Sequence, residues 1–260
     1  QGSKFVGWAD GQPGDHYFHP FVLPHGYLDA NLSAAWAALD GQVRFADLVS
    51  VQPAVCEAGL GPKQFATPEY AAVANYGYHL DATKLGLLLR RHAVETLGVR
   101  HIADHMTRVV STAQGDIAGL ETRGHGLLEA DLFIDCSGLR SLLIGQHFGV
   151  PKVDCSDVLF NDRALALQVD YATPDAAVAC QTISSAQPQG WIWDIGLPTR
   201  RGLGHVYSSR DCSDDEAAAR LLDYARRSGA AGHSLRSDPR QIRLDPGYRR
   251  ECWVNNCVAI

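Results

Sequence analysis

Two tryptophans with strand spacing are the most distinctive residues that could bind a flat or redox-active molecule. Trp191 and Trp193 lie in the apolar run Gly190–Pro198. Side chains at i and i+2 point to the same face of a sheet, so the pair predicts an aromatic wall. Ordinary packing of a sheet face explains the same pattern, and both interpretations stay open at this point.

A histidine and an aromatic residue share this spacing near the start of the chain. His16 and Phe18 lie within the first thirty residues, which are rich in aromatic residues, His, Gly and Pro. The two side chains could clamp a flat ring by stacking and edge contacts. A solvated histidine beside a core phenylalanine is the alternative. The composition is more typical of a pocket wall or loop than of a regular helix.

A third run ends an apolar strand in a tight turn. The sequence Asp135-Cys136-Ser137-Gly138 follows this strand and precedes a predicted short helix. Such a corner brings backbone close to a cofactor at the carboxyl end of a sheet. Because the same corner is common in scaffolds, it indicates a cofactor site only with further support.

The elements that must position these runs follow from periodicity and turn residues. Helices are predicted over 28–39, 81–97, 141–148 and 213–228, the last opened by a capping-box sequence. Strands are predicted over 99–103, 106–112, 117–122, 128–136, 164–171, 177–184, 191–197, 204–208 and 252–260. Residues 47–75 lack periodicity and predict a functional or partly helical connection. This order indicates an α/β protein with antiparallel additions, in two interleaved lobes.

Composition excludes several classes of protein. The chain has 260 residues, of which 46% are hydrophobic and 20% charged, as in globular proteins. A net charge of −6 without a basic run gives no footprint for nucleic acid. No run approaches about 18 apolar residues, so no membrane span is predicted. The seven cysteines and eleven histidines lack metal-ligand spacing, which predicts reduced thiols, a cytoplasmic protein and no metal site.

Taken together, the runs resemble the flavin-dependent tryptophan halogenases. Trp191, Trp193 and Ile195 match the family's W-x-W-x-I-P, although Gly196 stands where the family has Pro. His16 and Phe18 match an H-x-F that lines the indole site. The Asp135–Gly138 turn is similar to the family's D-C-S-G variant, and further matches follow in order along the whole chain.

The resemblance implies a fold like that of FAD-dependent monooxygenases, with the glutathione-reductase type of FAD fold, a mixed-sheet substrate region and an incomplete chain. Residues from about 76 to 150 would belong to the FAD-binding lobe, and 251–260 would return to it. Residues 1–75 and 151–250 would form the substrate-side lobe. Met106, Asp135, Ser137 and Gly138 would contact the cofactor, and His16 and Phe18 the substrate.

The resemblance also implies an activity. A separate flavin reductase would supply reduced FAD, which with oxygen and chloride or bromide gives hypohalous acid, and a lysine would direct the halogen to tryptophan or another indole. That lysine maps just before Gln1, and the family's glutamate maps beyond Ile260, so no catalytic residue is expected within 1–260. Lys4 lies in a different register. We expect an internal piece of a larger protein that is inactive alone; a homodimer is compatible with this interpretation.

Two alternatives stay open. A flavin-dependent aromatic hydroxylase would have a related fold, but the W-x-W-x-I run argues against it because hydroxylases lack this run. A non-catalytic homologue that binds aromatic molecules would keep the aromatic cleft without the reactive groups.

Overall fold

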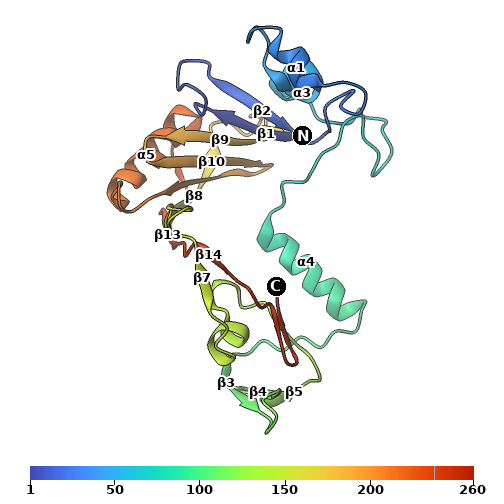
Figure 1. Cartoon of the computed structure of the whole chain (residues 1–260), viewed down its shortest axis with the longest axis vertical. Helices are drawn as coiled ribbons and strands as arrows, with labels where there is room; N and C mark the ends of the chain where they lie inside the picture. Colours follow the sequence, from blue (N-terminus) through green and yellow to red (C-terminus); the bar gives the residue numbers. More distant parts are fainter. Residues whose placement is uncertain (237) are drawn as a thin grey trace. The chain divides into compact units, whose positions relative to one another are not determined.

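The computed structural model describes residues 1–236 and 238–260. Its chain divides into two compact units (Figure 1). The first contains residues 1–82 and 161–244, and the second contains residues 83–160 and 245–260. Each unit therefore consists of two segments, and the segments of the two units alternate along the chain.

A mixed sheet of eight strands organises the first unit, in the order β12-β8-β11-β10-β9-β1-β2, with β13 also paired to β8. The strands are β1 (Gly2–Val6), β2 (His16–Pro20), β8 (Arg163–Tyr171), β9 (Thr182–Gln187), β10 (Gly190–Leu197), β11 (Arg200–Tyr207), β12 (Ala230–Leu235) and β13 (Arg240–Arg243). Only the β1–β9 pair is parallel among the described pairs of this sheet. The start of the chain is thereby joined to a strand that begins 180 residues later in the sequence.

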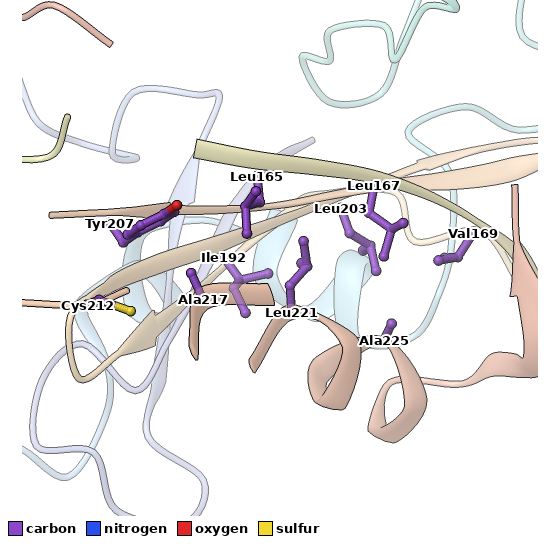
Figure 2. Close-up of a cluster of buried hydrophobic side chains, with 10 residues drawn as sticks. All are labelled: Leu165, Leu167, Val169, Ile192, Leu203, Tyr207, Cys212, Ala217, Leu221 and Ala225. Atoms are coloured by element: carbon purple, nitrogen blue, oxygen red, sulfur yellow. The ribbon is translucent and has the colours of Figure 1, made fainter. Parts of the chain in front are cut away.

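Helix α5 (Asp214–Arg227) covers part of one face of this sheet. It begins at Ser213 with a capping box, in which Ser213 and Glu216 satisfy each other's backbone N–H groups. Its apolar stripe packs on β8, β10 and β11 and forms the core of the unit (Figure 2). The buried members of this core are Leu165, Leu167, Val169, Ile192, Leu203, Tyr207, Cys212, Ala217, Leu221 and Ala225.

Three short helices follow β2 in the chain. They are α1 (Leu32–Ala37), α2 (Phe45–Val49) and α3 (Gln52–Glu57). The predicted helix over 28–39 is therefore shorter than expected, because Asn31 caps α1 through its side chain and residues 24–30 form turns. The aperiodic connection over 47–75 is partly helical, as predicted. Residues 2–6 and 16–20 are strands rather than loop.

The second unit combines a helix with three small sheets. Its elements are α4 (Ala82–Glu95, whose first residue belongs to the first unit), β3 (Met106–Ser111), β4 (Ile117–Thr122), β5 (Gly126–Glu129), β6 (Phe133–Asp135), β7 (Lys152–Asp154), β14 (Gly247–Arg249), β15 (Trp253–Val254) and β16 (Cys257–Ala259). A 3-10 turn at Gly138–Arg140 and a π-helical segment at Leu142–His147 follow β6. Strand β16 pairs in parallel with β6, and their side chains share a core with the π-helical segment.

Four predicted strands differ from the structure. The strand predicted over 128–136 is divided into β5, which ends at Glu129, and β6, which begins at Phe133. Residues 99–103 are irregular, because Gly98 is left-handed (φ 69°) and the Val99 N–H bonds back to α4. The strand predicted over 177–184 begins only at Thr182. The run 252–260 is a tight hairpin, because Asn255 adopts a left-handed conformation (φ 49°) between β15 and β16.

Candidate functional site

The two faces of β10 differ in burial and in chemistry. Trp191, Trp193 and Ile195 alternate with Ile192 and Asp194, and only the latter two are buried. Because strand residues alternate between faces, Ile192 and Asp194 face α5 while the two tryptophans share the opposite face. The predicted aromatic wall therefore exists on a half-buried surface.

This wall extends across neighbouring strands. The Trp191 ring lies 6.3 Å from Trp193 and 6.4 Å from Trp8. Trp8 lies 5.9 Å from Phe5, which stacks on Tyr17 at 5.1 Å. The five rings form a continuous row, here called the aromatic face, that joins β10 to β1 and β2. Trp8 and Tyr17 are exposed at 43% and 39%.

A glycine makes room for Trp193. Gly204 of β11 pairs with Trp193, and a Cβ at Gly204 would lie 1.9 Å from the indole ring. At Gly202, which pairs with Ile195, the nearest atom to such a Cβ is 3.9 Å away. The requirement for glycine is therefore specific to the position under the tryptophan.

A large cleft runs along β2, α1 and α2. Its volume is about 960 Å³, within the range of ligand pockets. Aromatic and apolar side chains dominate its lining, including Tyr17, Phe18, Phe21, Trp36 and Phe45, and His19 and Arg44 contribute polar atoms. This composition suits a flat, largely apolar molecule with a few polar groups.

His16 and Phe18 lie side by side in the structure, but His16 forms an ion pair and Phe18 packs in the core. Their rings meet edge to face at 6.1 Å, and Phe18 is buried. His16 Nε2 lies 3.0 Å from Glu57, which also pairs with Lys4 at 2.8 Å. The hydrogen bond and charge of the Lys4 ammonium, followed by the His16 imidazole ring, lower the pKa of Glu57 against the effect of burial. Phe18 lines the cleft, whereas His16 does not.

Sequence reasoning missed a second pair with the same spacing. His19 and Phe21 also match H-x-F, and both line the cleft. Phe21 is 46% exposed and lines a second cavity as well. The signal was present in the sequence, since the two H-x-F runs follow each other directly, but the faces of β2 could not be assigned without its partners.

The second cavity lies at the start of the chain. It measures about 450 Å³ and is lined by Gln1, Gly2, Phe21, Tyr76, Tyr78 and His79, among others. One ring nitrogen of His79 lies 3.1 Å from the Gly196 carbonyl and the other 3.2 Å from Thr182 Oγ1. Phe21 thus lines both the large cleft and the cavity that Gln1 lines.

In the second unit, Asp135 and Ser137 hold the turn after β6. The buried Asp135 carboxylate accepts the N–H groups of Leu143 (2.8 Å) and Ile144 (2.9 Å). Burial would raise the pKa of Asp135, but hydrogen bonds from Ser137, Ile144 and Leu143 outweigh it, so the pKa is lowered. Gly138 provides the left-handed residue of the turn (φ 63°).

A cavity opens at the carboxyl ends of the parallel strands β6 and β16. It measures about 450 Å³, and Asp135, Gly138, Ser141, Lys152, Arg249 and Ile260 are among its lining residues. Ligands of open α/β sheets bind beyond the carboxyl ends of the strands. The position fits a portion of a dinucleotide cofactor, and the cations Lys152 and Arg249 line the cavity together with the carboxylates of Asp245 and Glu251. Met106 lies on β3, partly buried against the core of this unit.

Comparison with known proteins decides the family. A model of the family described as tryptophan halogenase matches residues 1–260. The chain belongs to the tryptophan halogenase family. The tryptophan halogenase of Shewanella frigidimarina NCIMB 400 superposes with a TM-score of 0.92 and 47% identity, over 100% of this chain and 50% of that chain.

Other members give the same result. Tryptophan 7-halogenase RebH of Lentzea aerocolonigenes is 34% identical over 99% of this chain and 50% of its own length. Tar14, a tryptophan C-6 flavin-dependent halogenase (chlorinase), superposes with a TM-score of 0.88 and 33% identity, over 100% of this chain and 51% of that chain. The chain spans about half the length of the relatives it matches. The predicted α/β class with a mixed sheet, shared with flavin-dependent halogenases, is confirmed.

The described residues contain neither a candidate membrane span nor a candidate metal site. Across 1–236 and 238–260, no helix is long and apolar enough to cross a membrane. Within the same ranges, no three His, Cys, Asp or Glu side chains gather as metal ligands do.

Proposed function

We propose that these residues form the substrate-side sheet and part of the cofactor lobe of an FAD-dependent halogenase that acts on tryptophan or another indole. The observation that carries the proposal is the aromatic face, whose Tyr17 also lines the large cleft, in a chain of this family. Bound reduced FAD supplies the activation of oxygen that turns chloride or bromide into an electrophilic halogen. A separate flavin reductase would provide the reduced cofactor, and we infer a cytoplasmic location.

The residues of this chain would bind and shield rather than react. Trp191 and Trp193, supported by Gly204, present an apolar wall that excludes water from the reactive species. Gly196 stands where the family motif has proline, and β10 continues through it to Leu197. Asp135, Ser137 and Gly138 would shape the cofactor cavity, with Met106 as the proposed main-chain contact.

For the substrate, the cleft favours His19 and Phe21 over His16 and Phe18. His16 is held by Glu57, and Phe18 is buried in the packing of α2 and α3. Phe21 is accessible and lies next to Gln1, beside which the family's lysine maps. Flat rings are well held by one aromatic face and one imidazole edge.

The test uses the complete open reading frame that encodes residues 1–260. The purified protein is supplied with a flavin reductase, NADH, FAD, chloride or bromide, and tryptophan, and products are analysed by mass spectrometry. A halogenated tryptophan supports the proposal. Hydroxytryptophan would instead identify an aromatic hydroxylase, and tryptophan binding without any product would identify a non-catalytic homologue.

Two matched variants separate the histidine pairs. We expect His19→Ala to raise the KM for tryptophan by about tenfold, the equivalent of one lost contact of about 1.4 kcal/mol. His16→Ala should weaken the Glu57 ion pair with little change in KM. The reverse pattern would return the substrate contact to His16 and Phe18.

A further inference from the structure

Two cysteines from distant parts of the sequence meet in the first unit. Cys56 lies in α3 and is 4% exposed, in a small core cluster with Phe18 and Ala46. Cys180, two residues before β9, is partly exposed and packs against this cluster. One thiol is therefore buried, and its neighbour lies closer to solvent.

The two thiols interact directly. Burial, followed by the charge and hydrogen bond of the Cys180 side chain, raises the pKa of Cys56 to about 12. Cys180 Sγ also contacts Gln181 Oε1 at 3.4 Å. Cys56 thus stays a neutral thiol at physiological pH, whereas Cys180 is the accessible sulfur that an oxidant would reach first.

The pair lies where four elements meet. Glu57, next to Cys56 in α3, pairs with Lys4 of β1 and with His16 of β2. The Cys180 carbonyl accepts the main-chain N–H of Gln1 at 3.1 Å. A bond between the two sulfurs would tie α3 to the start of β9 beside the cavity lined by Gln1 and Cys180.

We propose that Cys56 and Cys180 are a modification site, a thiol pair that hydrogen peroxide oxidises reversibly to a disulfide. Peroxide transfers one oxygen to the Cys180 sulfur, giving a sulfenic acid and one water. The Cys56 sulfur then attacks Cys180 Sγ, the S–O bond breaks, and a second water leaves with the Cys56 proton. Two thiols and one peroxide become one disulfide and two waters, and an added dithiol reverses the change.

The proposal does not depend on the halogenation proposal, since it rests on two thiols in contact. It predicts an unusual pH dependence. The second step needs the Cys56 thiolate. With peroxide in such excess that this step limits the rate, disulfide formation should accelerate steadily as the pH rises toward 10.

The experiment is a disulfide map of the purified chain. Peroxide is added, free thiols are alkylated in denaturant, and peptides are analysed by mass spectrometry without reduction. We expect a Cys56–Cys180 linked peptide as the main disulfide, and its loss after dithiothreitol. The Cys136 and Cys252 peptides serve as internal controls for oxidation at exposed, unpaired thiols. If Cys56 is fully alkylated after peroxide treatment and no linked peptide forms, the proposal is overturned.

Two serine variants sharpen the assignment. In Cys56→Ser, the sulfenic acid at Cys180 should persist and be trapped by dimedone, at several times the wild-type yield. Cys212→Ser removes another buried thiol, which is not in this cluster, and should leave the linked peptide unchanged. Equal dimedone labelling of Cys180 in wild type and Cys56→Ser would contradict the role of Cys56. The map of the wild-type chain decides the question even where a variant does not fold.

Discussion

The two faces of the large sheet use the same strands for different purposes. On one face, β10 and β11 contribute Ile192, Leu203 and the ion pair of Asp194 with Arg201, all buried. On the other, they contribute Trp191 and Trp193 at intermediate exposure. Because side chains alternate along a strand, neighbouring residues of β10 stabilise the core on one face and form the proposed functional wall on the other. Substitutions on the two faces should therefore fail in different ways.

The largest loss of stability is expected from a change at the buried ion pair of Asp194 with Arg201. Arg201 donates to both carboxylate oxygens of Asp194 and to the Ser228 carbonyl. Arg201→Met leaves the Asp194 charge buried without its partner, which should cost about 3–5 kcal/mol in the free energy of unfolding. Urea unfolding followed by circular dichroism measures the loss.

The matched control is an exposed pair of the same kind. Arg236 and Asp170 are 41% and 39% exposed, so Arg236→Met should cost less than about 1 kcal/mol. Equal losses in the two variants would show that burial does not distinguish the pairs.

The next largest effect on stability is expected where β11 packs against Trp193 on the aromatic face. Gly204→Ala places a methyl group where the Trp193 ring lies, so the ring must move, at a cost of about 1–3 kcal/mol. Tryptophan fluorescence should shift at the same time. Gly202→Ala, on the same strand and face, has room for its methyl group and should change neither stability nor fluorescence.

A smaller and pH-dependent effect is expected beneath α5. His205 is fully buried, its Nδ1 lies 3.1 Å from the Ala217 carbonyl, and its Nε2 has no hydrogen-bond partner among the residues that the structure describes. Burial lowers its pKa from the ordinary 6.5, against the Ala217 hydrogen bond. The unfolded chain therefore binds this proton first, and stability falls as the pH drops below about 6.5, by at most about 1.4 kcal/mol per pH unit.

Unfolding curves at several pH values test this prediction against a His205→Gln variant. In the variant, the free energy of unfolding should no longer fall with pH in the interval between the ordinary and the lowered pKa of His205. A wild-type chain whose stability is flat from pH 7 to pH 5 would contradict it.

The smallest effect on stability is expected on the aromatic face. Trp191→Phe keeps an aromatic ring at a half-buried position and should cost less than about 1.5 kcal/mol. The same change should alter the aromatic face and, under the proposed function, the reaction. A loss as large as that of Arg201→Met would show that this face is also core.

Local features of the sequence predicted local structure. The spacing of Trp191 and Trp193 gave both the strand and the shared face, because alternation needs no distant partner. The capping box at Ser213 gave the start of α5 for the same reason. The helices α2 and α3, with five and six residues, carry too little periodicity to be recognised.

Features that depend on distant pairing were out of reach. The parallel pairing of β1 with β9 joins segments far apart in sequence, and nothing in either segment names its partner. This pairing, with α3 above it, puts Phe18 into the core and leaves Phe21 accessible. The choice between His16 with Phe18 and His19 with Phe21 follows from that arrangement, so the sequence alone could not make it. The roles of Met106, Asp135, Ser137 and Gly138 at the cofactor stay predictions.

One measurement tests most directly whether the aromatic face is a functional wall. The ratio of halogenated to hydroxylated tryptophan is determined for the complete open reading frame and for its Gly204→Ala variant, in which Trp193 is displaced, with Gly202→Ala as control. We predict that only Gly204→Ala lowers this ratio, because a displaced tryptophan admits water and ordinary oxygen transfer. An unchanged ratio in a folded Gly204→Ala protein that still turns over would contradict the account.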